Sequence, residues 1–156
     1  MPAHRPIDPA HEKKLFFDGI HLFNSHEFFE AHEVWEDAWR SIPRPPRGQI
    51  NVRREFYQGL IQCAVALEHY RRSNPRGVVS LYDSYRRHFK AVPDRFMGLH
   101  VQALLAAMRR ALAPVLDADP LPQRGQSTLD LATAPRIELD HDPFAAGDAA
   151  HYRELL

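Results

Sequence analysis

The segment FNSHEFFEAHEVWEDAWR, residues 23–40, indicates the fold class because its apolar residues recur at the spacing of a helix. When the segment is projected at about 100° per residue, one side of the helix is apolar and holds Phe28, Ala31, Trp35, Ala38 and Trp39. The opposite side carries Glu30 and Asp37. A helix with one apolar side buries that side against its neighbours. The segment therefore predicts one helix of a packed bundle.

Four further helices are expected around this segment. Helical spacing and start signals place them at about residues 9–23, 53–72, from Asn74-Pro75 onward, and 99–113. Asn24, with Glu27 three residues later, is expected to cap a helix over about 25–41. Pro114 is expected to end the last helix. No segment alternates clearly between apolar and polar residues as a strand would. The chain thus predicts an all-α fold, a single compact bundle of about five helices over residues 9–116.

Residues 117–156 form an acidic, proline-rich C-terminal tail. They hold 3 Lys/Arg and 8 Asp/Glu, whereas residues 1–116 hold 17 and 12. The recurring prolines interrupt any helical period, and the segment PRIELD suggests a short extended piece. The tail is expected to be partly disordered or packed on the basic body. Partial packing is favoured by the apolar residues Ile137, Leu139 and Phe144.

The amino-acid composition limits the cellular location and the binding partners that can be expected for this protein. The formal net charge is zero, so global charge does not favour nucleic acid or an anionic membrane. Cys63, the one cysteine, excludes an internal disulfide and a cysteine-rich zinc cluster. No stretch of 18 apolar residues predicts a membrane span, and the first residues lack the apolar core of a signal peptide. A cytoplasmic protein is expected. The partner is not indicated, although one open apolar flank would allow a homodimer.

The opening segment contains His-Glu-x-x-Glu twice, from His26 to Glu30 and from His32 to Glu36. A shift of six residues rotates a helix by about 240°, so the two copies point in different directions. The first copy is interpreted as a solvated first turn. The second copy lies at the edge of the apolar stripe, where Glu33 and Arg40 flank it. It is either an internal His–Glu–Arg network that stabilises the helix or part of a binding site.

The expected third helix carries a narrow polar stripe on an otherwise apolar surface. Its members are Glu55, Gln58, Gln62 and His69. The stripe is either the solvated edge of this helix or faces the polar edge of the second helix, because buried polar groups need partners. The second interpretation predicts a polar pocket between the two helices. Its candidate residues are His32, Glu33, Glu36, Trp39, Arg40, Gln58, Gln62 and His69.

The residue pattern of this pocket limits the chemistry it could carry out. A zincin requires His-Glu-x-x-His, and here Glu36 occupies the last position. The weak metal alternative uses His32, Glu36 and His69 as ligands. A di-iron site requires Glu-x-x-His on two helices, and the one such spacing, Glu138 to His141, lies in the tail. No glycine-rich phosphate loop is present, and no cofactor is indicated. Two interpretations are open for a set of arginines: they form a basic binding face, or they lie on the solvent-facing sides of their helices. These arginines are at positions 71, 72, 76, 86, 87, 109 and 110. Nucleic-acid binding is not favoured.

The chain resembles the DUF309 family, small all-helical proteins of unknown function, over about Leu15 to Leu112. The resemblance rests on LFNSHEFFEAHEVWEDAWR followed by FYQGLIQCAVALEHYRRSNPRGVVSLY. The family pattern falls on Glu30, His32, Glu33, Glu36, Trp39, Gln58, Gly59, Gln62, His69, Asn74 and Gly77. It implies a compact helical bundle and no particular activity.

Two classes of function remain open. The favoured one is a non-catalytic binding, interaction or structural domain whose His/Glu/Gln network lies between the second and third helices. The alternative is a small-molecule- or metal-binding protein, including a hydrolase, that would use His32, Glu33, Glu36 and His69, with Glu33 or Glu36 as the base.

Overall fold

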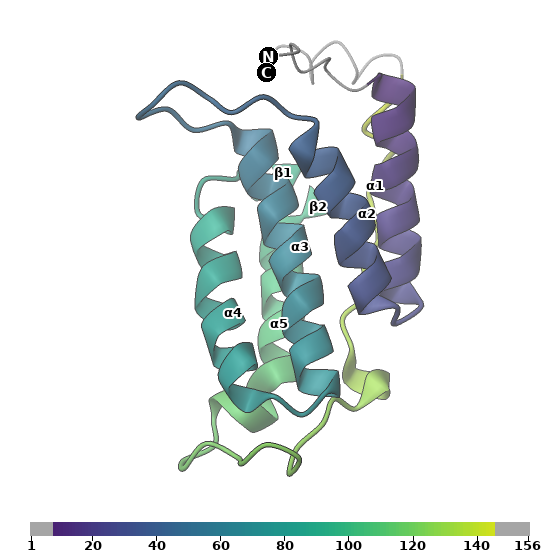
Figure 1. The fold of residues 1–156 in the computed structure, drawn as a ribbon. Helices are drawn as coiled ribbons and strands as arrows, with labels where there is room; N and C mark the ends of the chain where they lie inside the picture. Colours follow the sequence, from purple (N-terminus) through teal and green to yellow (C-terminus); the bar gives the residue numbers. More distant parts are fainter. Residues whose placement is uncertain (1–7, 146–156) are drawn as a thin grey trace.

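The computed structural model describes residues 8–145, which form five α-helices and one short β-hairpin (Figure 1). The helices are α1 (Pro9–Asn24), α2 (Phe28–Arg40), α3 (Val52–Arg71), α4 (Pro75–Phe89) and α5 (Val101–Leu116). The hairpin strands are β1 (Arg95–Phe96) and β2 (Leu99–His100), and a 3-10 turn covers Leu131–Thr133. The predicted fold, mostly helical with five helices, is confirmed.

Helix α3 is central: it packs against α2 on one side and α4 on the other, and α1 packs on α2 (Figure 1). Helix α5 lies behind α3 and α4 in this view. This position explains why α3 is apolar on most of its circumference, since it is covered on several sides. The largest fully buried side chains come from α1 to α5 and include Phe16, Trp35, Tyr57, Tyr85 and Met108.

Trp35 joins α1 to α2. Its indole nitrogen donates to the carbonyl oxygen of Phe16 at 3.2 Å, and its ring lies against Gly19, where an added Cβ would come within 2.1 Å of that nitrogen. Phe23 and Phe28 close the turn between the helices with ring centroids 5.6 Å apart. The apolar stripe of residues 23–40 therefore faces α1 and α3, and the polar edge of α2 points outward.

The expected helix cap at Asn24 was wrong. Asn24 is the last residue of α1, and α2 begins only at Phe28. The side chain of Asn24 instead pairs with the backbone of Ile137: its amide donates to the carbonyl at 2.9 Å and its oxygen accepts from the amide at 2.8 Å. A distant backbone segment thus takes the hydrogen bonds that a local cap would have used.

The expected end of α5 at Pro114 was also wrong, because the helix continues through Pro114 to Leu116. Val115 is buried, and its packing accounts for the last turn despite the hydrogen bond that proline cannot donate. The helix begins at Val101, close to the predicted start at about residue 99, and Leu99 pairs with Phe96 in the hairpin before it. Strands of two residues are too short to show an alternating pattern.

Residues 117–145 run around the end of the bundle and return behind α2 in the view of Figure 1. Leu129 and Ile137 are buried, and Phe144 packs on Phe16 and Phe17 with centroid distances of 5.8 and 6.4 Å. The rest of the expected tail, residues 146–156, lies outside the described residues. Within residues 8–145, no helix combines the length and apolarity that a bilayer crossing requires.

Candidate functional site

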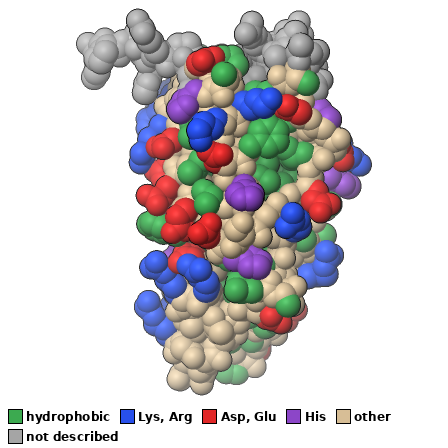
Figure 2. All heavy atoms as spheres, turned by 90° about the vertical axis from the view of Figure 1, so that its right-hand side faces the viewer, with side chains coloured by type: hydrophobic (Ala, Val, Ile, Leu, Met, Phe, Trp, Pro, Cys, Tyr) green, Lys and Arg blue, Asp and Glu red, His purple; other side chains and the backbone are tan. Residues whose placement is uncertain are grey.

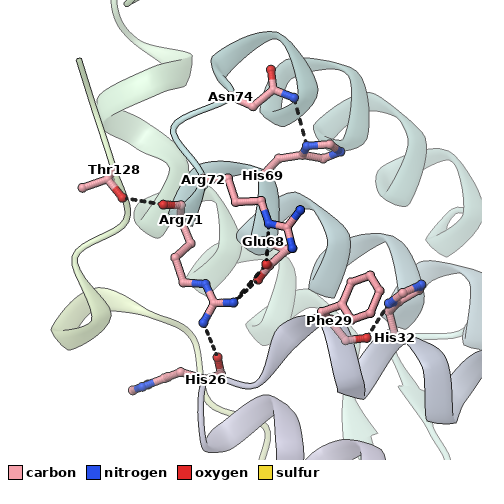
Figure 3. A network of polar contacts seen from close by, with 9 residues as sticks. All are labelled: His26, Phe29, His32, Glu68, His69, Arg71, Arg72, Asn74 and Thr128. Atoms are coloured by element: carbon pink, nitrogen blue, oxygen red, sulfur yellow. Dashed lines mark hydrogen bonds and ion pairs between the residues drawn. The ribbon is translucent and has the colours of Figure 1, made fainter. Parts of the chain in front are cut away.

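A groove of about 190 Å³ lies between α2 and α3. It is lined by Phe29, His32, Val65, Glu68, His69 and Arg72. The two α2 residues face the end of α3, and Figure 3 shows them beside the polar network around Glu68. Phe29 is 43% exposed, which is unusual for a phenylalanine and leaves an apolar ring at the rim. The groove therefore combines apolar surface with three kinds of polar side chain.

His69 is held by the start of α4. Asn74, the N-cap of α4, accepts from the amide of Gly77 through Oδ1 at 3.3 Å. Its Nδ2 must then donate, and it lies 3.0 Å from Nδ1 of His69. Nδ1 of His69 is therefore the acceptor and Nε2 carries the proton. Gly77 leaves room for the ring, because a Cβ there would lie 2.7 Å from His69 Nδ1.

His32 has the opposite tautomer when neutral. Its Nδ1 lies 2.5 Å from the carbonyl oxygen of Phe29, which can only accept. Nδ1 therefore donates and Nε2 keeps its lone pair. That Nε2 lies 3.6 Å from a carboxylate oxygen of Glu36, and Glu36 is also bonded by Arg40 at 2.6 Å. The His–Glu–Arg contacts of the second motif copy are thus present along α2.

Glu68 and Arg72 belong to the groove and were missed in the sequence. The Glu68 side chain is only 8% exposed, and it is bound by Arg71 at 2.7 Å and Arg72 at 2.8 Å (Figure 3). The three- and four-residue spacing on α3 is the signal that could have revealed them. Partial burial, and then the positive charges of Arg72 and Arg124, lower the pKa of His69, while Glu68 opposes them. His69 therefore lies close to two arginine side chains and one carboxylate.

The eight predicted pocket residues do not form one site. His32 and His69 line the groove together. Glu33 is exposed, Gln58 and Gln62 bond to each other along α3 at 3.0 Å, and Trp39 stacks under the guanidinium of Arg54 at 4.6 Å. The expectation that both glutamines and Glu33 line the same pocket as His32 is therefore not met, because these side chains occupy different parts of the α2–α3 surface.

Metal ligands do not gather in the described part of the chain. Among residues 8–145, no three His, Cys, Asp or Glu side chains come together as a metal site requires. The suggested set His32, Glu36 and His69 therefore does not form one. His32 and Glu36 approach each other along α2, whereas His69 turns its Nδ1 toward Asn74.

A second polar cluster joins α1 to α3 and was not predicted. Arg53 and Glu12 are both buried and lie 2.8 Å apart, and the hydroxyl of Tyr57 donates to Glu12 at 3.0 Å. In the sequence, Glu12 looks like an ordinary acid of a first helical turn. Because the cluster lies in the interior and its charges are paired, it resembles a structural contact that orients α1 on α3.

The fold and the groove define a small helical-bundle domain with a partly open groove between α2 and α3. Residues 16–81 match the family described as "Domain of unknown function (DUF309)", so the resemblance seen in the sequence is confirmed over this segment. The match covers α2 and α3 completely and reaches into α4. It therefore includes every residue that lines the groove.

Two curated relatives share similarity with the chain. One is an "Uncharacterized protein YpuF" from Bacillus subtilis (strain 168), 34% identical over 101 residues, which are 62% of this chain and 53% of the relative. The other is an "Uncharacterized protein" from Aquifex aeolicus (strain VF5), 24% identical over 108 residues, which are 69% of this chain and 31% of the relative. The matched region is thus about half of one relative and a third of the other.

Proposed function

We propose that this protein is a non-catalytic, cytoplasmic interaction domain whose groove between α2 and α3 receives one side chain of a partner protein. The size of the groove carries the proposal. Sites that enclose a whole small molecule usually measure roughly 300–1,000 Å³, whereas this groove measures about 190 Å³. The groove between α2 and α3, taken by itself, therefore suits a single side chain of a partner better than a cofactor or a drug-sized substrate.

The lining of the groove supports this proposal. Val65 and the exposed ring of Phe29 provide apolar contact, and His69 and Arg72 provide donors at the edge. Interface positions that contribute most to affinity commonly combine a buried apolar anchor with polar groups around it. The same arrangement would orient an inserted side chain through its polar end.

The carboxylates near the groove are engaged, which argues against acid–base catalysis. Glu68 is bound by two arginines and Glu36 by Arg40. These contacts occupy carboxylate oxygens that a substrate would otherwise meet. The alternative function, a hydrolase with Glu36 as base and His32 as shuttle, depends on their 3.6 Å approach.

The lengths of the relatives fit an interaction module. The matched region covers about half of one relative and a third of the other, so a domain of this kind is combined there with additional sequence. In our proposal, residues 9–116 form the module, and the described part of the tail, residues 117–145, packs on it.

The proposal can be tested with capped amino acids as probes. N-acetyl amino acid amides with acidic, basic, aromatic and aliphatic side chains are titrated against protein with isotope-labelled methyl and imidazole groups. At least one class is expected to shift the signals of Val65 and His69 in a saturable way. Val65→Trp fills the groove and abolishes these shifts, whereas Val79→Trp, a matched change at an exposed valine of α4, leaves them unchanged.

Two results would contradict the proposal. One is that all probe classes leave Val65 and His69 unshifted or act equally on the Val65→Trp protein. The other is turnover of a simple ester that is lost in Glu36→Gln and retained in Val65→Trp, which would favour the hydrolase.

A further inference from the structure

Arginines gather where α3 passes into α4, next to the groove. Arg71 and Arg72 end α3, Arg76 lies in the first turn of α4, and Arg124 belongs to the segment that follows α5. Arg76 and Arg124 are exposed and form no ion pair within residues 8–145. Glu68 is the one carboxylate that lines the groove, and two arginines already neutralise it. This end of the bundle therefore carries excess positive charge.

A second hollow of about 430 Å³ lies at the start of α4. It is lined by Asn74–Arg76 on one side and by residues 121–124 on the other. Asn74 connects the two hollows, because it lines the second and donates a hydrogen bond to His69 in the first. Arg124 lines the second hollow and also lowers the pKa of His69. Arg124 thus lies near both hollows.

The wall of the second hollow is anchored to the bundle. Ser73 donates from its hydroxyl to the carbonyl of Ser127 at 2.5 Å, and its own Oγ accepts from the amide of Gly125 at 2.8 Å. Thr128 donates to the carbonyl of Arg71 at 2.9 Å (Figure 3). These contacts hold residues 125–128 against the end of α3. The adjoining Arg124 is therefore kept beside the groove.

We propose that the two hollows together bind an acidic, extended segment of a partner protein. This inference rests on the proposed function and names the chemistry of the partner. One carboxylate of the segment occupies the groove, where Nε2–H of His69 and the guanidinium of Arg72 donate to it. A second carboxylate, further along the segment, lies between Arg76 and Arg124. Arginine clusters recognise acidic motifs by such charge-assisted hydrogen bonds.

A nucleic acid fits this surface less well than an acidic peptide. Helix α2, which lines one side of the groove through Phe29 and His32, also carries the exposed acids Glu30, Glu33 and Asp37. Figure 2 shows acidic side chains gathered along one edge of the face it views, with basic side chains next to them. A phosphate backbone carries a charge at every nucleotide and would be repelled along α2. A short acidic segment meets only the arginine-rich end.

The test is a fluorescence-anisotropy titration of the full chain with a capped, labelled peptide of alternating glutamate and glycine. A length of about eight residues reaches roughly 28 Å when extended, enough for both hollows. The peptide is expected to bind at low ionic strength and to weaken as salt is added. The double change Arg76→Glu/Arg124→Glu is expected to weaken the affinity by about tenfold.

A matched control keeps the total charge equal. Arg87→Glu/Arg110→Glu reverses two exposed arginines of α4 and α5 outside both hollows and is expected to change affinity by no more than about twofold. Binding is also expected to raise the pKa of His69, since an anion beside the ring favours its charged form. General attraction of opposite charges, without a site, would not single out that histidine.

The inference is overturned if both double variants weaken the peptide equally, or if the pKa of His69 stays unchanged at saturation. It is also overturned if a single-stranded oligothymidylate of the same charge binds more tightly than the peptide. If the acidic peptide fails while aromatic or aliphatic probes still shift Val65, the inference falls and the proposed function stands.

Discussion

Asn74 offers a sharp test of the hydrogen bonds that hold His69. Its Oδ1 accepts from the amide of Gly77, and its Nδ2 donates to Nδ1 of His69. Asn74→Asp keeps the acceptor for Gly77 but replaces the donor with a carboxylate oxygen. Nδ1 of His69 must then carry a proton to keep its hydrogen bond. The substitution is therefore expected to raise the pKa of His69, opposite to its direction in the wild type.

The expected changes in stability follow from the same contacts. Asn74→Ala removes an N-cap, which costs about 1 kcal/mol, and one neutral hydrogen bond, which costs about 1 kcal/mol more. We therefore expect a loss of about 2 kcal/mol in the free energy of unfolding. Asn74→Asp retains the cap and puts a negative charge at the start of α4, which the helix dipole favours. Its partly exposed ion pair with His69 adds at most about 1 kcal/mol.

The pH dependence distinguishes these variants most clearly. In the wild type the pKa of His69 is lowered from 6.5, so the unfolded chain binds the proton more tightly and stability falls as pH drops below about 6.5. In Asn74→Asp the pKa is raised, so the added stability is present at low pH and is lost as pH rises through the raised value. The contribution of His69 to the slope of stability against pH should therefore reverse sign.

Urea unfolding between about pH 5 and 8, together with imidazole resonances of His69, measures both effects. The variant His69→Gln, measured alone and with each Asn74 variant, isolates the contribution of this histidine from that of other titrating groups. If Asn74→Asp leaves the pKa of His69 lowered and its slope unreversed, the assignment of Asn74 and of the His69 tautomer is wrong.

Three further substitutions test the packing around the groove and the core. Gly77→Ala places a Cβ 2.7 Å from the His69 ring, so it should displace the ring and weaken binding of the capped amino acid probes. The substitution also gains about 1 kcal/mol in helix propensity. Probe-induced shifts of the His69 signals that equal those of the wild type would contradict this prediction. Gly19→Ala brings a Cβ within 2.1 Å of Trp35 and should lower the free energy of unfolding by about 1–3 kcal/mol through overpacking. The tryptophan fluorescence of the folded state should also change. A more stable protein would refute the close packing. Glu68→Gln should cost about 1–2 kcal/mol in urea unfolding, because it weakens the bonds to two partly exposed arginines, and stability equal to the wild type would show that these bonds contribute nothing.

The helices were predictable where one local pattern decided them. The apolar stripe of residues 23–40 and the start signal at Asn74-Pro75 depend on neighbours within one or two turns, and the structure has helices there. Asn24 was misread because its capping pattern competes with a backbone partner at Ile137, far away in the chain. Pro114 was misread because the burial of Val115 outweighs a local breaker.

The candidate site was predictable only in part. The edge position of His32 and the polar stripe that includes His69 placed both on the facing surfaces of α2 and α3, and both line the groove. The rotation of α3 about its axis relative to α2 then determined which other residues line the groove with His32 and His69. It brings Glu68 and Arg72 to the groove and leaves Gln58 and Gln62 bonded to each other.

The sequence by itself determined the helical class, the amphipathic faces and the separation of the two His-Glu-x-x-Glu copies, because the helical period fixes direction around each axis. Only the tertiary structure decided the tautomer of His69, the set of residues that line the groove and the second hollow. These properties depend on how α2, α3, α4 and residues 121–128 meet in space. Helical periodicity sets no distance between separate segments, whereas hydrogen bonds and charge interactions are decided by distances of a few ångströms.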